Sequence, residues 1–230
     1  MVDIAANCRT IFERIGRAAA RSGRDAGAVK LLAASKLQSA EKIWAAAAGG
    51  VRLVGENYVQ EAAAKKPMIS AAVEWHLIGH LQRNKAKAAL DLFDVIESLD
   101  SVELARALDK EAGARGRVVR ALIEVNLGGE AGKSGVAAER LQPLLESVAT
   151  LRHVKVEGLM AVPPFSEDAE SARPYFKQLR ELRDKGKTAA AANIDLKELS
   201  MGMSQDFEVA IEEGATLVRV GTALFGPRER

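Results

Sequence analysis

Short apolar runs and longer runs of helical periodicity alternate along almost the whole chain. A polar or glycine-containing loop follows most of the apolar runs and leads into a helical run, and the segment after the last apolar run is short. This order is typical of repeated β/α units. The predicted strands span residues 30–35, 51–55, 74–78, 94–98, 119–126, 154–162, 197–200 and 217–221. The predicted helices span residues 4–22, 39–48, 59–66, 81–90, 102–112, 137–150, 168–185 and 206–213.

Eight β/α units behind one leading helix favour an α/β fold, a closed (β/α)8 barrel of the TIM type with an extra N-terminal helix. A doubly wound open sheet is the alternative, because periodicity alone does not separate the two. Ser39 and Ser101 are placed to cap the helices that follow them. No Ser-, Gly- or Pro-rich linker divides the sequence, so we expect residues 1–230 to form a single domain.

The composition is that of an ordinary globular protein, with 48% hydrophobic and 28% charged residues. A net charge of +2 argues against an extended basic surface for nucleic acid. The one cysteine, Cys8, has no internal partner for a disulfide, and no apolar run approaches the roughly 20 residues of a membrane helix. The first residues lack the apolar core of a signal peptide. We therefore expect a cytoplasmic protein without a nucleic-acid or membrane partner.

A barrel of this kind carries its functional residues where the strands end. Lys36 follows the first strand, on the strand face that also carries Leu32 and Ala34. A lysine at the mouth of a barrel can form a Schiff base or act as a general base. The alternative is an ordinary solvated lysine at a strand end.

The loops after the second and third strands carry further polar side chains. Asn57 can orient a polar ligand, or it can cap the next helix. His76 and His80 are four residues apart, but this spacing places two ligands together only on a helix, and here Gly79 separates them. We therefore expect no metal site.

The loop after the fifth strand contains Gly132, Lys133 and Ser134. It does not match a nucleotide-binding P-loop, because the first glycine of that motif would fall on Leu127. We interpret this loop as a lid that carries one positive charge, Lys133.

The last two strands end in small and hydroxylated residues. Phosphate groups bind at this position in barrels, and glycines allow backbone N–H groups to approach them. The candidate phosphate-binding residues are Ser200, Gly202, Ser204, Gly221 and Thr222.

Arg219 lies on the strand face of Leu217 and Gly221. If that face points into the barrel, its guanidinium needs a partner such as Glu157, Asp100 or a ligand atom. An amine at Lys36 beside a phosphate site suits pyridoxal 5′-phosphate (PLP), or a sugar phosphate that forms an imine.

Segments along almost the whole chain resemble the pyridoxal phosphate homeostasis proteins, the YggS/PROSC group. They are LLAASK at 31–36, GENYVQE at 55–61, WHLIGHLQRNK at 75–85, EVNLGGEAGKSG at 124–135, GLMAVP at 158–163, LSMGMSQDFEVAIEEGA at 199–215 and VRVGTALFG at 218–226. Their common order makes the resemblance specific.

The resemblance implies a barrel like the N-terminal domain of bacterial alanine racemase, with PLP as cofactor. It implies that Lys36 holds PLP as an internal aldimine, that Arg219 faces the pyridine nitrogen, and that Asn57 and Tyr58 lie in the loop near the cofactor. One departure is Gln38, where many members carry a second lysine. A role in cofactor transfer proposed for that lysine does not carry over to this chain.

The resemblance also implies that Ser200, together with the backbone of Gly221 and Thr222, binds the phosphate group. Lys133 matches the lysine of the family's loop after the fifth strand, so a route for cofactor transfer through Lys133 stays open.

The expected function is non-catalytic: a PLP-binding carrier in intracellular PLP homeostasis that buffers or delivers PLP with little or no turnover. An arginine beside the pyridine nitrogen leaves that nitrogen unprotonated and weakens the ring as an electron sink. Racemisation also needs a second base opposite Lys36. In racemases a C-terminal β domain supplies it, whereas this sequence ends nine residues after Gly221.

The alternatives are a small PLP-dependent amino-acid racemase and a sugar-phosphate isomerase or lyase. We expect a monomer, with apo forms of PLP-dependent enzymes as candidate recipients of the cofactor.

Overall fold

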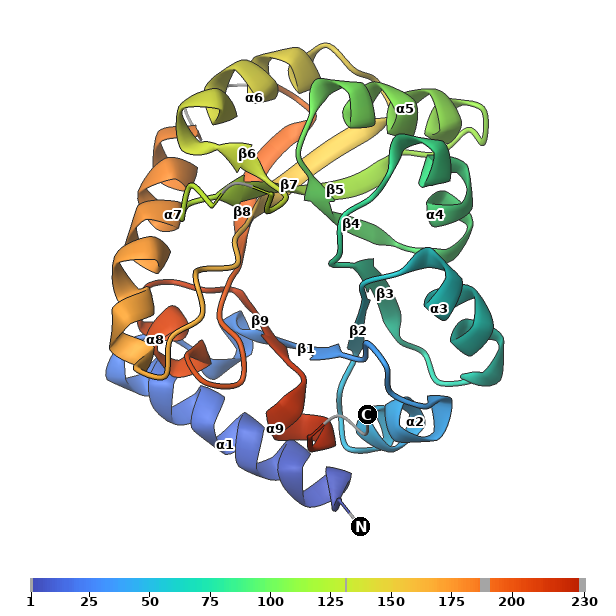
Figure 1. Cartoon of the computed structure of the whole chain (residues 1–230). Coiled ribbons are helices and arrows are strands. Elements are labelled where there is room, and N and C mark those ends of the chain that lie inside the picture. Colours follow the sequence, from blue (N-terminus) through green and yellow to red (C-terminus); the bar gives the residue numbers. More distant parts are fainter. Residues whose placement is uncertain (1, 131, 187–190, 228–230) are drawn as a thin grey trace.

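Eight parallel strands form a closed ring with helices around its outside (Figure 1). The computed structural model describes residues 2–130, 132–186 and 191–227. The barrel strands are β1 (Lys30–Ala34), β2 (Leu53–Glu56), β3 (Glu74–Leu77), β4 (Val95–Leu99), β5 (Val119–Asn126), β7 (Val154–Met160), β8 (Ile194–Ser200) and β9 (Leu217–Val220). β9 pairs with β1 and β4 pairs with β5, so the ring closes. The predicted barrel is confirmed and the open sheet is excluded.

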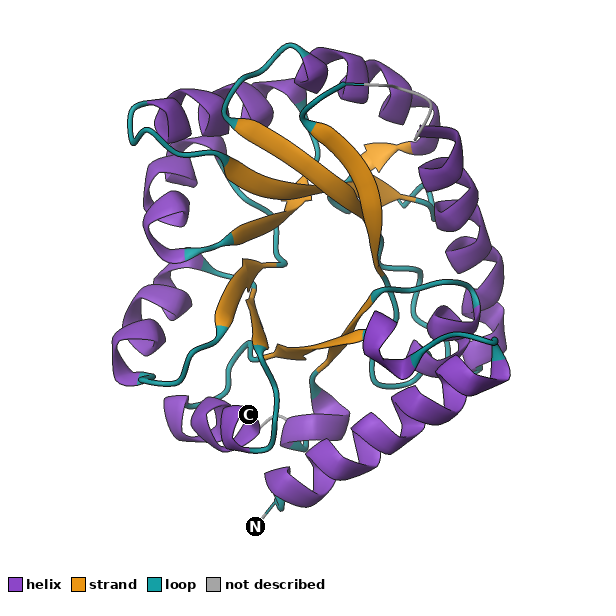
Figure 2. Cartoon of the chain, turned by 180° about the vertical axis from the view of Figure 1, so that it is seen from behind, coloured by secondary structure: helices purple, strands orange, loops and turns teal. Residues whose placement is uncertain are grey.

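Helices connect successive strands along the outer surface, and Figure 2 shows them around the ring from behind. The α-helices are α1 (Ile4–Arg21), α2 (Ala40–Ala48), α3 (Val59–Lys65), α4 (Ala86–Leu92), α5 (Val102–Gly113), α6 (Leu141–Ala149), α7 (Arg173–Gly186), α8 (Phe207–Glu212) and α9 (Thr222–Phe225). The side chains of Ser39 and Ser101 accept hydrogen bonds from Lys42 N–H and Leu104 N–H, which confirms both predicted caps. None of the helices in the described ranges is both long and apolar enough to cross a membrane.

The predicted boundaries differ from the structure mainly where a helix begins. Short 3₁₀ turns, Arg83–Lys85, Ala138–Arg140 and Ala169–Ala172, precede α4, α6 and α7. The strand β8 begins at Ile194, earlier than predicted, because Asp195 and Lys197 interrupt the apolar run that marks a strand. A two-residue strand, β6 (Val136–Ala137), pairs with the end of β5 and was not predicted.

The continuous apolar core lies between the ring of strands and the helices. Side chains alternate along each strand, so one face packs under the helices and the other fills the barrel. Ala33, Val54 and Val218 belong to the outer core. Leu32, in contrast, pairs in register with Leu53 on β2 and with Arg219 on β9, and this layer lies inside the barrel. The interior therefore holds a buried charged side chain beside aliphatic ones.

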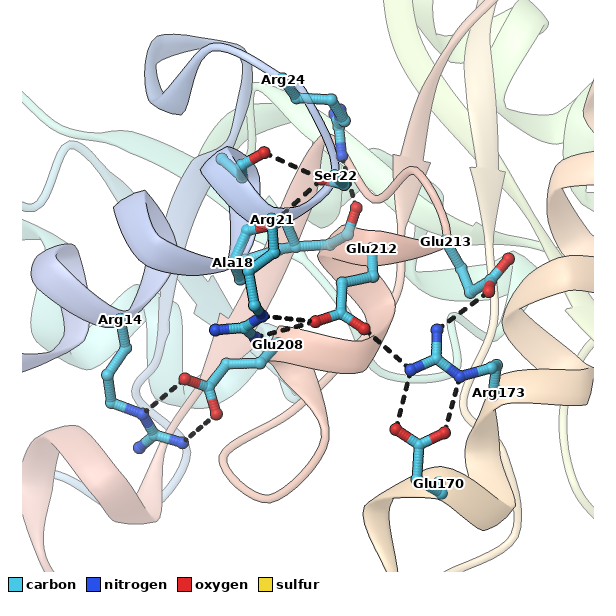
Figure 3. Close-up of polar contacts among 12 residues, drawn as sticks. Arg14, Ala18, Arg21, Ser22, Arg24, Glu170, Arg173, Glu208, Glu212 and Glu213 are labelled. Carbon is cyan, nitrogen blue, oxygen red and sulfur yellow. Dashed lines mark hydrogen bonds and ion pairs between the residues drawn. The ribbon is translucent and has the colours of Figure 1, made fainter.

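The leading helix α1 packs against α8 and α9 across the outside of the ring (Figure 1). Its apolar face buries Cys8, Ile11 and Ile15. Ion pairs along its edge join it to α8, and Arg173 extends the network toward α7 (Figure 3). The pairs are Arg14–Glu208, Arg21–Glu212, Arg173–Glu170, Arg173–Glu212 and Arg173–Glu213. Partly exposed pairs of this kind contribute little stability each, so the buried apolar face of α1 carries most of its attachment to the barrel.

Candidate functional site

A cavity of about 880 Å³ opens at the C-terminal ends of the strands, where the barrel fold carries its chemistry. Its wall combines an amine, a guanidinium, an amide and hydroxyl groups with apolar side chains. The lining residues that matter here are Lys36, Gln38, Asn57, Ile78, Val162, Phe165, Ser166, Met203, Ser204, Asp206, Arg219, Gly221 and Thr222. The segments after β1, β2, β3, β7, β8 and β9 all contribute. The structure therefore brings together residues that are far apart in the sequence.

Lys36 lies two residues beyond the end of β1 and lines the cavity, as the strand alternation predicts. Its side chain is half-buried, and its Nζ lies 5.4 Å from the centre of the Tyr58 ring. Tyr58 is itself 50% exposed at the rim. The amine is thus accessible from the cavity and held beside an aromatic face.

Arg219 lies inside the barrel with only 4% of its surface exposed, and its guanidinium reaches the cavity wall. Its Nη1 donates a 2.6 Å hydrogen bond to Ser200 Oγ, and its Nη2 donates a 2.8 Å hydrogen bond to the carbonyl oxygen of Ala161. Burial lowers the pKa of Arg219, and the charges of nearby carboxylates oppose that shift.

The two carboxylates suggested from the sequence as partners of Arg219 are engaged elsewhere. Glu157 pairs with Arg120 and Lys155, and Asp100 pairs with His80. The prediction that a buried Arg219 has a partner is confirmed, but neither of the two suggested carboxylates is that partner, and the suggested ligand atom stays a prediction. Glu97 supports Arg219 through Ser200 and through its charge.

A chain of buried polar groups continues from Ser200 down the barrel. Ser200 Oγ donates to Glu97 Oε2 at 2.5 Å, and the other oxygen of Glu97 lies 2.6 Å from His76 Nδ1. His76 Nε2 lies 3.0 Å from Glu74, which also binds Arg120. Both imidazole nitrogens therefore face carboxylates, an arrangement that favours the doubly protonated ring.

The ionisation of this chain follows from its contacts. Burial alone favours neutral His76, but the hydrogen bonds to Glu74 and Glu97 raise its pKa to about 9. Burial alone raises the pKa of Glu97, yet the hydrogen bond and charge of His76 bring it below its ordinary value. His76 is thus the cation that keeps Glu97 charged beneath Arg219.

Ser200, a predicted phosphate ligand, is the last residue of β8. Its side chain is fully buried, its hydroxyl is engaged by both Glu97 and Arg219, and it is absent from the residues that line the cavity. In this structure the Ser200 hydroxyl links Arg219 to Glu97. Ser204, four residues further along, does line the cavity, and its Oγ accepts the Ala223 N–H at 3.1 Å.

Gly221 and Thr222 line the cavity at the start of α9. The first N–H groups of a helix have no acceptor inside that helix, and in α9 the Ala223 N–H already donates to Ser204 Oγ. Gly221, Thr222 and Ser204 share the cavity lining with the apolar residues Ile78 and Val162.

Asn57 also lines the cavity, and the structure excludes its alternative role as a helix cap. The N-cap position of α3 belongs to Tyr58. Gly79 lies directly against this loop, because a Cβ added there would come within 2.4 Å of the Asn57 carbonyl oxygen. Because Gly79 has no side chain, the loop after β2 can pack directly against it.

Several residues highlighted by the sequence lie away from this cavity. Lys133 is paired with Glu130 of its own loop, and His80 lies over a second, shallower surface pocket with Arg83 and Asp100. Gln38, in contrast, lines the main cavity, and its Oε1 accepts a hydrogen bond from Lys42. Across the described ranges, no group of three or more His, Cys, Asp or Glu side chains is arranged to hold a metal ion.

The sequence reasoning missed Glu97 and the carbonyl group of Ala161. Glu97 left a detectable signal, since a carboxylate stands alone within the apolar strand β4, and alternation points it into the barrel. The carbonyl of Ala161 left none, because backbone groups are the same at every position.

The comparisons with known proteins agree with this geometry. The family model described as "Alanine racemase, N-terminal domain" matches residues 3–229. The pyridoxal phosphate homeostasis protein of Aquifex aeolicus is 48% identical over 95% of this chain and 96% of its own length. This chain belongs to the pyridoxal phosphate homeostasis protein family. The family resemblance inferred from the sequence segments is therefore confirmed.

Two solved structures that match this chain come from a relative with PLP bound and from an alanine racemase. PipY of Synechococcus elongatus, in a structure with PLP bound, matches with a TM-score of 0.81 and 40% identity, over 94% of this chain and all of that chain. Alanine racemase from Corynebacterium glutamicum matches with a TM-score of 0.76 and 17% identity, over 98% of this chain and 60% of that chain. The racemase likeness shows the fold alone, and it agrees with the predicted similarity to that enzyme's N-terminal domain.

Proposed function

We propose that this chain binds PLP in the cavity at the barrel mouth, anchored on Lys36, and stores and releases it in PLP homeostasis. The observation that carries the proposal is that Lys36 and Arg219 line one cavity together with hydroxyl and backbone N–H groups. A primary amine reacts reversibly with the aldehyde of PLP and releases water. The PLP-bound PipY structure and the names of the relatives support this cofactor.

The donor set fits the three parts of PLP. Lys36 offers the amine for the aldehyde. Arg219, fixed by Ser200 and Ala161, offers N–H groups to the pyridine nitrogen. For the phosphate we propose Ser204 with the Gly221–Thr222 backbone, and we assign Ser200 to the support of Arg219 instead. Asn57 stays a proposed neighbour of the cofactor.

The same residues argue for storage over turnover. Arginine keeps its proton at neutral pH, so the pyridine nitrogen beside it stays unprotonated and the ring stabilises a carbanion poorly. Among the described lining residues, Asp206 is the only titratable side chain besides Lys36 and Arg219. Its Oδ1 already accepts the Met203 N–H at 2.6 Å. We therefore propose a carrier that acts in the cytoplasm as a monomer and passes PLP to apo-enzymes.

The first test is the visible spectrum of the purified protein before and after borohydride, followed by peptide mass analysis. We expect an imine band that bleaches on reduction and a pyridoxyl phosphate group fixed on Lys36. Lys36→Met should remove both signals, whereas Lys87→Met, on the exposed face of α4, should keep them. A colourless protein that stays unmodified after incubation with PLP would contradict the proposal and favour a sugar-phosphate ligand.

The second test separates a carrier from a racemase. We expect L-amino acids incubated with the PLP-loaded protein to keep their configuration over many hours. Steady racemisation at rates of roughly 1 s⁻¹ or more, as in ordinary enzymes, would reject the carrier proposal. Asp206→Asn would then show whether Asp206 is the second base.

A further inference from the structure

Leu37, the neighbour of Lys36, has an unusual backbone conformation. Its φ is +61°, and within the described ranges no other residue except glycine has a positive φ. A side chain with a Cβ is disfavoured in this left-handed region. Its own side chain offers no compensation, since it is 60% exposed. A strained residue that persists is held by its surroundings, and such residues gather at functional sites.

The turn from Ser35 to Gln38 is closed by its own hydrogen bond, from the Gln38 N–H to the Ser35 carbonyl oxygen at 2.9 Å, and further contacts come from α3. The Leu37 N–H donates a 2.9 Å hydrogen bond to Glu61 Oε2. Lys65 Nζ donates to the same oxygen at 2.8 Å and to the Ser35 carbonyl oxygen at 3.0 Å. The residues on both sides of Lys36 are therefore tied to one carboxylate–ammonium pair.

Glu56 fixes the position of Lys65 in the Glu61–Lys65 pair. It is fully buried, and its Oε1 accepts hydrogen bonds from Lys65 Nζ and Ser35 Oγ, each at 2.7 Å. Lys65 is itself only 13% exposed, and it joins Glu56 to Glu61. A buried ammonium with three fixed oxygen acceptors has little freedom to move. This cluster also accounts for both acidic residues of the segment 55–61, which the cofactor contacts leave unexplained.

We propose that Glu61 is a positioning residue for Lys36: with Lys65 it holds the turn at Leu37 in its left-handed conformation, and so directs the Lys36 side chain into the cavity. The effect of this turn on PLP binding rests on the proposed function, whereas the effect of Glu61 on the turn does not. Each part therefore has its own measurement.

The first measurement uses the protein without PLP. Replacing Glu61 by Gln removes the charged acceptor of the Leu37 N–H. We expect the Leu37 amide to exchange with solvent about tenfold faster, because the neutral amide oxygen of glutamine is a weaker acceptor than the carboxylate. The matched control is Glu41→Gln, which removes an acidic residue from the first turn of the neighbouring helix α2. Unchanged exchange in Glu61→Gln would overturn the proposal.

The second measurement is a rescue, with PLP affinity and borohydride-trapped yield on Lys36 as readouts. Glu61→Gln should weaken PLP binding about tenfold. Adding Leu37→Gly should restore most of it, because glycine adopts the left-handed conformation without strain. Adding Leu37→Ala should not, because alanine removes the exposed side chain but keeps the strain. Equal rescue by both substitutions, or by neither, would overturn the proposal.

Two controls keep the outcomes separate. Thermal melting identifies a variant that fails to fold. If Glu61→Gln fails to fold, Glu61→Asp takes its place, since aspartate keeps the charge but has a shorter side chain that does not reach the Leu37 N–H as well. If the wild-type protein takes up no PLP, the proposed function fails. The exchange of the Leu37 amide still decides whether Glu61 holds the turn.

Discussion

At the scale of single residues, the charge of Arg219 is balanced through an intermediate. Ser200 stands between Arg219 and Glu97, and His76 stands behind Glu97. Burying a charge without a partner inside a barrel costs free energy, and a fixed network of hydrogen bonds and opposite charges offsets that cost. The same network sets the direction in which Arg219 presents its N–H groups to the cavity.

Ser200 gives a residue-scale prediction that separates two roles. We expect Ser200→Ala to weaken binding of PLP and of pyridoxal, which lacks the phosphate, by the same factor of about ten. Ser204→Ala should weaken PLP binding and leave pyridoxal nearly unchanged, because it removes a hydroxyl of the proposed phosphate site. Titrations with the two aldehydes measure this. A loss in Ser200→Ala confined to PLP would show that Ser200 contacts the phosphate directly.

His76 gives a prediction for the pH dependence of stability. Its pKa is raised to about 9 in the folded protein, from about 6.5 in an unfolded chain. The stabilisation is therefore complete below pH 6.5 and is lost as the pH rises through 9. We expect the free energy of unfolding to fall by about 3 kcal/mol over that range.

Urea denaturation at a series of pH values above 7 measures this loss. Glu124, whose pKa burial and Asp100 raise to about 7, also titrates at the lower end of this series, so the contribution of His76 is read from the slope above about pH 8. His76→Gln should flatten the slope, and His153→Gln, a partly exposed control, should retain it. A wild-type stability that is constant from pH 7 to 10 would show that His76 is not protonated in the folded state.

At the scale of elements, the loops after β2 and β3 depend on each other. Replacing Gly79 by Ala would place a Cβ 2.4 Å from the Asn57 carbonyl oxygen and 2.7 Å from its Cα. Because backbone cannot move aside as a side chain does, we expect a loss of about 1–3 kcal/mol of stability and weaker PLP binding. Gly16→Ala in α1 is the control, since nothing lies within 4 Å of its added Cβ. Unaltered melting and PLP affinity in Gly79→Ala would refute this dependence.

Helices and strands could be predicted from the sequence where one local pattern determines them. All eight strands followed from apolar runs, and the serine caps followed from their position before a helix. The 3₁₀ turns and the start of β8 did not, because they depend on contacts with the rest of the fold. The hydrogen bonds of Ser200 to Arg219 and Glu97 were not predicted for a similar reason: strand alternation gives the direction of a side chain but not how deep it lies. The predicted contacts with PLP stay predictions for all six residues: Lys36, Asn57, Ser200, Arg219, Gly221 and Thr222.

At the scale of the whole molecule, the closed ring accounts for how distant segments form one site. Six loops converge on one end of the barrel, so Lys36 and Arg219 meet although most of the chain separates them. Counting β/α units in the sequence was enough to predict that convergence. That residues 1–230 form a single domain stays a prediction.

The closure also limits how another protein can meet this one. Each of the eight barrel strands has a neighbour on both sides, so none offers the open row of N–H and C=O groups that lets a second chain add a strand. Because the cavity opens among the loops at the mouth, an apo-enzyme that received PLP directly would approach those loops, where Tyr58 and Phe165 are 50% and 75% exposed. The exit of the cofactor and the surface for its recipient would then be the same small area.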